Sequence, residues 1–135
     1  MTSEIIYQGG LRTQATHLQS GDVILTDAPK DNHGKGEAFS PTDLVATALG
    51  SCMLSIMGII ANRHAINIVG TRVSIHKIMQ ASPRRIAAIE VTMYMPQEVS
   101  YTAKERTLLE NAARTCPVAL SLHPDLEQKL LFVYK

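Results

Sequence analysis

The stretch Ser40–Ala61, SPTDLVATALGSCMLSIMGIIA, decides the fold of this chain. It opens with a helix-start pattern: Ser40 suits the N-cap, Pro41 the first helical position, and Asp43 places a negative charge in the first turn. No charged residue follows as far as Ala61. Apolar residues recur at three- and four-residue steps, namely Leu44, Val45, Ala48, Leu49, Cys52, Ile56, Ile59 and Ile60. The other positions are mostly small, so the pattern predicts a central helix that neighbours approach on most sides.

Composition narrows the function classes. The 135 residues suit one domain, 1–135, and 13 basic against 12 acidic residues leave a net charge of +1. This balance gives no electrostatic case for nucleic acid or for a membrane surface. Aromatic residues make up 4% and tryptophan is absent, which argues against a base-stacking platform.

Two further observations bear on the cellular compartment of the protein. The opening MTSEIIYQGG lacks the basic and apolar regions of a secretory signal. The uncharged run after Asp43 just meets the length of a membrane span, but its glycines and hydroxyl residues make it weakly apolar. We therefore expect a buried helix in a soluble, cytoplasmic protein.

The remaining pattern predicts an α+β fold of strands, a long helix, a hairpin, shorter helices and a final strand. A Gly9-Gly10 turn is expected to join the first two strands, and a polar loop to run from Asp27 to Phe39. Thr102 with Glu105 forms a capping-box pattern. The expected strands are 4–8, 11–18, 23–26, 69–79, 86–95 and 126–134, and the later helices run to about 114 and 122.

The chemistry depends on two cysteines, because a thiol is a nucleophile only as its thiolate. Cys116 precedes Pro117 and is predicted to cap a short helix, a position that lowers a thiol pKa. Cys52 lies mid-helix among apolar residues, where a thiol is inert unless a cation from another part of the chain stabilises its thiolate. Arg12 and several histidines could supply that cation. Spacing alone favours two structural cysteines over a redox pair. No Cys or His pair has metal-ligand spacing, so neither a metal nor a cofactor is expected.

Two segments together carry a resemblance. SPTDLVATALGSC followed by a long apolar helix, and later NAARTCPVALSL, resemble the OsmC/Ohr family of thiol peroxidases. The SPTDL opening is closer to the general OsmC-like branch than to the organic-hydroperoxide-resistance proteins proper. The resemblance implies an OsmC-like fold, in which antiparallel sheets wrap around long central helices in an intertwined homodimer.

The same resemblance implies a mechanism. Cys52 matches the family's peroxidatic cysteine, which becomes a sulfenic acid when it reduces an organic hydroperoxide or hydrogen peroxide. Cys116 matches the resolving cysteine, which forms a disulfide with it, and an external dithiol then restores both thiols.

An arginine on an early strand activates the family's thiolate, and Arg12 in GGLRT is the match. Its alternative is a surface arginine on a hairpin, in which case His17, Lys35 or His33 would be examined next. The family often has a glutamate ten residues before the peroxidatic cysteine, where this chain has Thr42. Asp43 lies on a neighbouring face of the helix, and Glu37 in the loop could substitute.

Two classes of function therefore remain open. The first is a peroxidase that uses Cys52 and Cys116. The second is a non-catalytic dimer that binds a small hydrophobic molecule in a methionine-lined cleft, where the cysteines are incidental. A structural disulfide is the least expected, because a cytoplasmic protein keeps its thiols reduced.

Overall fold

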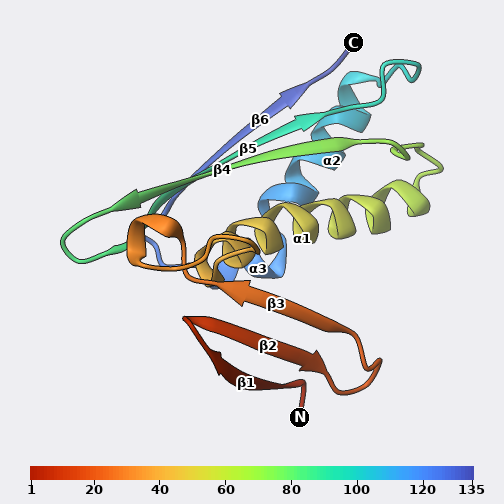
Figure 1. Cartoon of the computed structure of the whole chain (residues 1–135). Helices are drawn as coiled ribbons and strands as arrows, with labels where there is room; N and C mark the ends of the chain where they lie inside the picture. Colours follow the sequence, from red (N-terminus) through yellow and green to blue (C-terminus); the bar gives the residue numbers. More distant parts are fainter. The chain divides into compact units, whose positions relative to one another are not determined.

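The computed structural model describes every residue from Met1 to Lys135, and the chain divides into two units, Met1–Val45 and Ala46–Lys135. In chain order the elements are β1 (Ser3–Gly9), β2 (Arg12–His17), β3 (Val23–Asp27), the 3-10 turn η1 (Lys30–Asn32), α1 (Pro41–Arg63), β4 (Arg72–Gln80), β5 (Arg85–Tyr94), α2 (Ala103–Arg114), α3 (Pro117–Ser121) and β6 (Glu127–Val133) (Figure 1). The α+β class predicted from the sequence is confirmed. The single domain expected over residues 1–135 stays a prediction.

The first unit is built on an antiparallel sheet in the order β1-β2-β3. The predicted Gly9-Gly10 turn is wrong by one residue, because a register shift between Tyr7 and Gly9 makes Gly9 pair with Arg12. The turn residues are Gly10 and Leu11, with φ angles of 60° and 61°, which suits the right-handed twist of a two-residue hairpin. Arg12 is consequently the first residue of β2.

The loop after β3 folds back on itself. It was expected to begin at Asp27, but Asp27 is the last residue of β3 and pairs with Arg12. Backbone amides of the two loop glycines close the turn, from Gly34 to the Pro29 carbonyl at 2.9 Å and from Gly36 to the Ala28 carbonyl at 3.2 Å. A Cβ on Gly34 would overlap the Ala28 backbone, so the turn requires glycine there. The end of the loop is thereby held beside β3.

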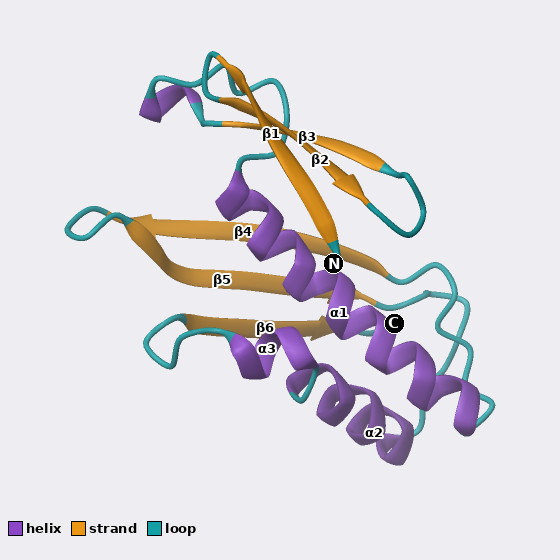
Figure 2. Cartoon of the chain, turned by 90° about the horizontal axis from the view of Figure 1, so that it is seen from below, coloured by secondary structure: helices purple, strands orange, loops and turns teal.

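The second unit contains a mixed sheet in the order β4-β5-β6. β4 and β5 are antiparallel as expected, whereas β5 and β6 are parallel, in contrast to the purely antiparallel sheets anticipated. The reason is that α2 and α3 lie between these two strands in the sequence and provide the long crossover that a parallel pair needs. All three helices of this unit lie on one face of the sheet (Figure 2).

The core of the second unit joins α1 and α2 to the covered face of the sheet. Its side chains are almost fully buried, and they include Leu49, Met53 and Met57 from α1, Ile89, Val91 and Met93 from β5, and Leu109 and Ala113 from α2. α1 approaches β4 closely, since a Cβ on Gly50 would lie 2.8 Å from Ile75 Cδ1. The methionines expected to line a cleft are core residues instead: Met53, Met57, Met93 and Met95 are at most 2% exposed.

The other side of α1 is left largely uncovered. An 18-residue window of this helix has a mean hydropathy of 2.1, and 33% of it is buried. By length and composition alone the helix could cross a membrane, which is weak evidence because the core helix of a soluble protein passes the same test. Val45 and Ile59 remain 38% and 48% exposed.

Truncation of Leu49, which is 0% exposed in the core, tests this packing. We expect Leu49→Ala to lower the free energy of unfolding by about 2–5 kcal/mol, because the substitution removes buried contacts and leaves a cavity. Lys104→Ala, at an exposed position of α2, is the control and should stay within about 0.5 kcal/mol of the parent protein. Urea unfolding at one fixed protein concentration measures both. Equal stability of the two variants would contradict the packing of α1 against the core of the second unit.

Candidate active site

Two groups of chemically competent side chains stand out, one in each unit. The second unit holds Cys52 on α1 and Cys116 between α2 and α3, and both are free thiols. The first unit holds Arg12 with two carboxylates from β3 and the following loop. All four residues predicted for the site, Arg12, Glu37, Cys52 and Cys116, therefore belong to one of these two groups.

Cys116 is the N-cap of α3, as the sequence predicted. Its Sγ accepts a hydrogen bond from the Ala119 backbone N–H at 3.3 Å, and Pro117 occupies the first helical turn. The side chain is fully buried in the core of the second unit. α3 spans Pro117–Ser121, one residue short of the expected end at Leu122.

The expectation of a lowered pKa at Cys116 is wrong. Burial raises the pKa of the Cys116 thiol above its ordinary value, and this effect exceeds the opposing one of the Ala119 N–H. A hydrogen bond with the Cys52 side chain raises the pKa of Cys116 further. Burial therefore outweighs the capping position and favours the neutral thiol of Cys116 over its thiolate.

Cys52 is only partly buried, in contrast to Cys116. It was expected to be buried among apolar residues, but the uncovered side of α1 leaves its thiol partly accessible. It packs against the core that contains Cys116, and its side chain is close enough to raise the pKa of that thiol. The packing of α1 beside the α2–α3 junction thus brings together two thiols that lie far apart in the sequence.

Arg12 binds the carboxylate of Asp27, a residue that the sequence pattern did not mark as part of a site. Its Nε donates to Asp27 Oδ1 and its Nη2 to Asp27 Oδ2, both at 2.7 Å. The Asp27 side chain is 0% exposed and that of Arg12 21% exposed. The Arg12 guanidinium holds the pKa of Asp27 below its usual value, and Asp27 raises the pKa of Arg12 in turn. The register of the hairpin was the missing signal, because Arg12 and Asp27 are directly paired across β2 and β3.

Glu37 is the second carboxylate on the same guanidinium. Arg12 Nη2 donates to Glu37 Oε2 at 3.1 Å, and the Glu37 backbone N–H donates to Asp27 Oδ2 at 3.1 Å. Asp43, the other acid considered, engages the start of α1, where Ser40 N–H donates to Asp43 Oδ2 at 2.9 Å and Ser40 Oγ accepts from Asp43 N–H at 3.0 Å. Asp27 and Glu37 are therefore the acids bonded to Arg12.

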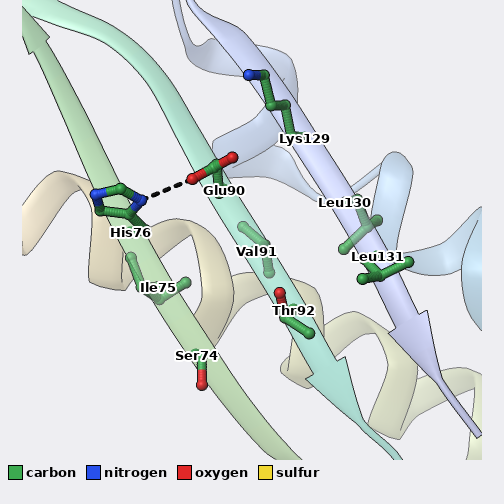
Figure 3. Close-up of a pocket in the computed structure, with 9 residues that line it drawn as sticks. All are labelled: Ser74, Ile75, His76, Glu90, Val91, Thr92, Lys129, Leu130 and Leu131. Atoms are coloured by element: carbon green, nitrogen blue, oxygen red, sulfur yellow. Dashed lines mark hydrogen bonds and ion pairs between the residues drawn. The ribbon is translucent and has the colours of Figure 1, made fainter.

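The other candidates form no comparable cluster. His17 bonds the Ser20 hydroxyl, and His33 ends η1 in a left-handed conformation. On the open face of the second sheet, His76 pairs with Glu90 at 2.6 Å beside a shallow hollow of about 310 Å³ (Figure 3). His76 is 71% exposed, and solvent weakens such a pair. No group of three or more His, Cys, Asp or Glu side chains is placed to hold a metal ion.

The Arg12–Asp27 pair predicts a pH dependence of stability. The folded-state pKa of Asp27 lies below its ordinary value of 3.8, so the pair stabilises the protein above that pH and less as the pH falls through the folded-state pKa. We expect Asp27→Asn to lower the urea midpoint at neutral pH, and the difference from the parent protein to shrink below pH 3.8. Glu37→Gln, at a 68% exposed side chain, is the control and should change the midpoint less. A difference that does not vary with pH would exclude the ionised pair as its source.

Comparison with known proteins places the chain in a family. The family model for OsmC-like proteins matches residues 34–130. A search of curated proteins finds no match. A crystal structure from Psychrobacter arcticus 273-4, provisionally described as an osmotic stress induced and detoxification response protein, is 51% identical, covers 98% of this chain and 96% of its own, and has a TM-score of 0.93.

More distant structures share the fold. An organic hydroperoxide resistance protein OsmC from Legionella pneumophila is 17% identical, with 98% and 96% coverage and a TM-score of 0.76. An organic hydroperoxide resistance protein from Elizabethkingia anophelis is 20% identical, with 100% and 97% coverage and a TM-score of 0.71. Because the family model spans most of the chain and the Psychrobacter structure is half identical over nearly all of it, this protein belongs to the OsmC-like family.

Proposed function

We propose that this protein is a thiol-dependent peroxidase that reduces organic hydroperoxides or hydrogen peroxide through Cys52 and Cys116. The observation that carries the proposal is that these two free thiols pack at the same core, close enough for Cys52 to raise the pKa of Cys116. The chain also shares its fold with proteins named for organic hydroperoxide resistance. Two adjacent thiols supply the two electrons that reduction of one O–O bond requires.

The proposed reaction has three steps. The Cys52 thiolate attacks one peroxide oxygen and the O–O bond breaks, which leaves Cys52 as a sulfenic acid and releases an alcohol, or water from hydrogen peroxide. The Cys116 sulfur then attacks the sulfenic sulfur, the S–O bond breaks and water leaves as the disulfide forms. An external dithiol reduces this disulfide by thiol–disulfide exchange and is itself oxidised.

The environments of the two cysteines support this division of roles. Cys52 is partly exposed, so a peroxide can reach it, whereas Cys116 is fully buried. The raised pKa of Cys116 keeps it protonated and therefore unsuited to the first attack. In this proposal Arg12 stabilises the thiolate and donates hydrogen bonds to the peroxide, because a guanidinium keeps its charge at any relevant pH. Glu37 assists by binding Arg12.

The alternative, a non-catalytic dimer that binds a small hydrophobic molecule, has no specific observation in its favour. The methionines that would line its cleft fill the core of the second unit, as Met53, Met57 and Met93 do. The hollow on the open sheet face includes charged and hydroxyl side chains, among them His76, Glu90 and Lys129 (Figure 3). The peroxidase therefore explains more of the chain.

The proposed active form is a homodimer in the cytoplasm. In a single chain 33% of the apolar window of α1 is buried, and the rest of it is partly or fully exposed. Strands of the first unit add further exposed apolar side chains, namely Ile5, Ile6, Tyr7, Val23, Ile24 and Leu25. A second copy would remove this surface from water. A reducing compartment would keep Cys52 and Cys116 free between turnovers.

Titration with peroxide tests the catalytic proposal. One equivalent should consume both thiols and leave an intramolecular Cys52–Cys116 disulfide, detected by thiol counting and by mass spectrometry of the digested protein. Cys116→Ser should still react once and stop at a Cys52 sulfenic acid that a sulfenic-acid trap labels. Cys52→Ser, the matched control, should lose the reaction. Peroxide consumption by Cys52→Ser at the rate of the parent protein would refute the assignment.

Light scattering tests the assembly. We expect a particle of twice the 14.8 kDa chain mass at micromolar concentration. Ile59→Glu should shift the equilibrium towards monomer, because it places a charge on the uncovered side of α1. Leu131→Glu, at a 59% exposed leucine on the open sheet face, is the matched control and should remain dimeric. A folded parent protein that stays monomeric would contradict the dimer.

A further inference from the structure

We propose that Gln128 is a positioning residue for Cys116, an inference that rests on the peroxidase function proposed above. Gln128 on β6 donates to the backbone of Ala119 in α3, and Ala119 in turn donates to the Cys116 sulfur. Gln128 therefore acts through α3 rather than on the reacting atoms. All three residues belong to the second unit, which also contains Cys52.

Gln128 is the polar member of an otherwise apolar row. Along this part of the chain the less exposed side chains alternate with exposed ones, and they belong to Leu126, Gln128, Leu130 and Phe132. The three apolar members pack at the core of the second unit. A partly buried amide on such a face is costly unless it is hydrogen-bonded. The bond that satisfies it runs from Gln128 Nε2 to the Ala119 carbonyl at 2.9 Å.

This bond reaches a helix that is too short to satisfy its own backbone. α3 has five residues, and the first four N–H groups and last four carbonyl groups of any helix lack partners within it. Ala119 falls in both sets. Its N–H donates to Cys116 Sγ at 3.3 Å, and its carbonyl accepts from Gln128. Ala119 is thus held from both sides by side chains, with α3 beside β6 (Figure 2).

The Ala119 N–H matters in the step in which Cys116 reacts. In the proposed reaction the Cys116 thiolate attacks the sulfenic sulfur of Cys52, the S–O bond breaks and water leaves as the S–S bond forms. Burial raises the pKa of the Cys116 thiol, and the hydrogen bond from Ala119 opposes this effect. By fixing Ala119, Gln128 keeps that N–H directed at the sulfur and favours the thiolate that this step requires.

Stopped-flow oxidation of the protein at several peroxide concentrations tests the proposal, because the attack on peroxide depends on its concentration and disulfide formation does not. Gln128→Met keeps an unbranched side chain of similar length and removes its donor. The variant should leave the first rate unchanged and slow the second about threefold at neutral pH, as expected when one hydrogen bond is lost and a more basic thiolate partly compensates. A sulfenic-acid trap should accordingly capture more of the oxidised Cys52.

The pH profile of the second rate distinguishes positioning from general loosening of the fold. In Gln128→Met its midpoint should move to higher pH, and the rate should match or exceed that of the parent protein once Cys116 is ionised in both. Leu130→Ala, in the same row, is the matched control. It should lower the free energy of unfolding and leave the midpoint in place, because it removes buried contacts and no donor.

The outcomes separate this inference from the function on which it rests. A parent protein that forms no Cys52–Cys116 disulfide with peroxide removes the underlying function, and the inference falls with it. If the parent forms the disulfide and Gln128→Met has an unchanged second rate and midpoint, only the positioning is overturned. A shift of the midpoint in Leu130→Ala as large as that in Gln128→Met also overturns it, since the effect would then come from the fold.

A measurement on the parent protein covers the case in which Gln128→Met fails to fold. The side-chain amide protons of Gln128, assigned through their proximity to Ala119, should exchange with water slowly because one of them is bonded to the Ala119 carbonyl. Gln19, exposed in the turn after β2, supplies the comparison and should exchange rapidly. Equal exchange rates for the two glutamines would overturn the positioning.

Discussion

Burial of one face of α1 against the sheet of β4, β5 and β6 is the constraint on which the second unit depends. Leu49, Met53 and Met57 enter the core on this face, and Gly50 lets the helix backbone approach β4. This packing leaves Cys52 partly exposed and close enough to Cys116 to raise the pKa of that thiol. The thiol pair is thus a consequence of helix packing, since nothing in the spacing of the two cysteines brings them together.

The parts of the fold that could be predicted from the sequence are those encoded by local chemistry. Pro41 and Asp43 mark the start of α1, Thr102 caps α2, and Pro117 makes Cys116 the cap of α3. Each signal acts within one turn of helix, where the sequence contains the whole cause. The direction of β6 has no such local cause, because parallel pairing with β5 depends on where α2 and α3 return the chain.

The roles of Cys52, Cys116, Arg12 and Glu37 stay predictions, and of the side chains bonded to Arg12 the sequence pointed to only one. Arg12 and Glu37 were named from the sequence, but Asp27 was assigned to a loop because it begins a polar stretch rich in Pro, Gly and Asn. The register that pairs Arg12 with Asp27 is set by the turn between β2 and β3, which is closed by hydrogen bonds from His17 N–H to the Asp22 carbonyl and from Gly21 N–H to the His17 carbonyl. The position ten residues before Cys52 holds Thr42, and the glutamate that bonds Arg12 is Glu37, which comes from the loop after β3.

The raised pKa of Cys116 has a chemical consequence under the proposed mechanism. When a sulfenic acid is converted to a disulfide, the departing hydroxide needs a proton, and a Cys116 that rests protonated supplies one as its thiolate forms for the attack. A thiolate at this position would lack that proton and would also compete with Cys52 for peroxide. Burial, which overrides the capping position of Cys116, therefore suits the resolving cysteine, while the partly exposed Cys52 is left to meet the substrate. One tertiary effect, desolvation of a single thiol, thus orders the two steps in which the cysteines react.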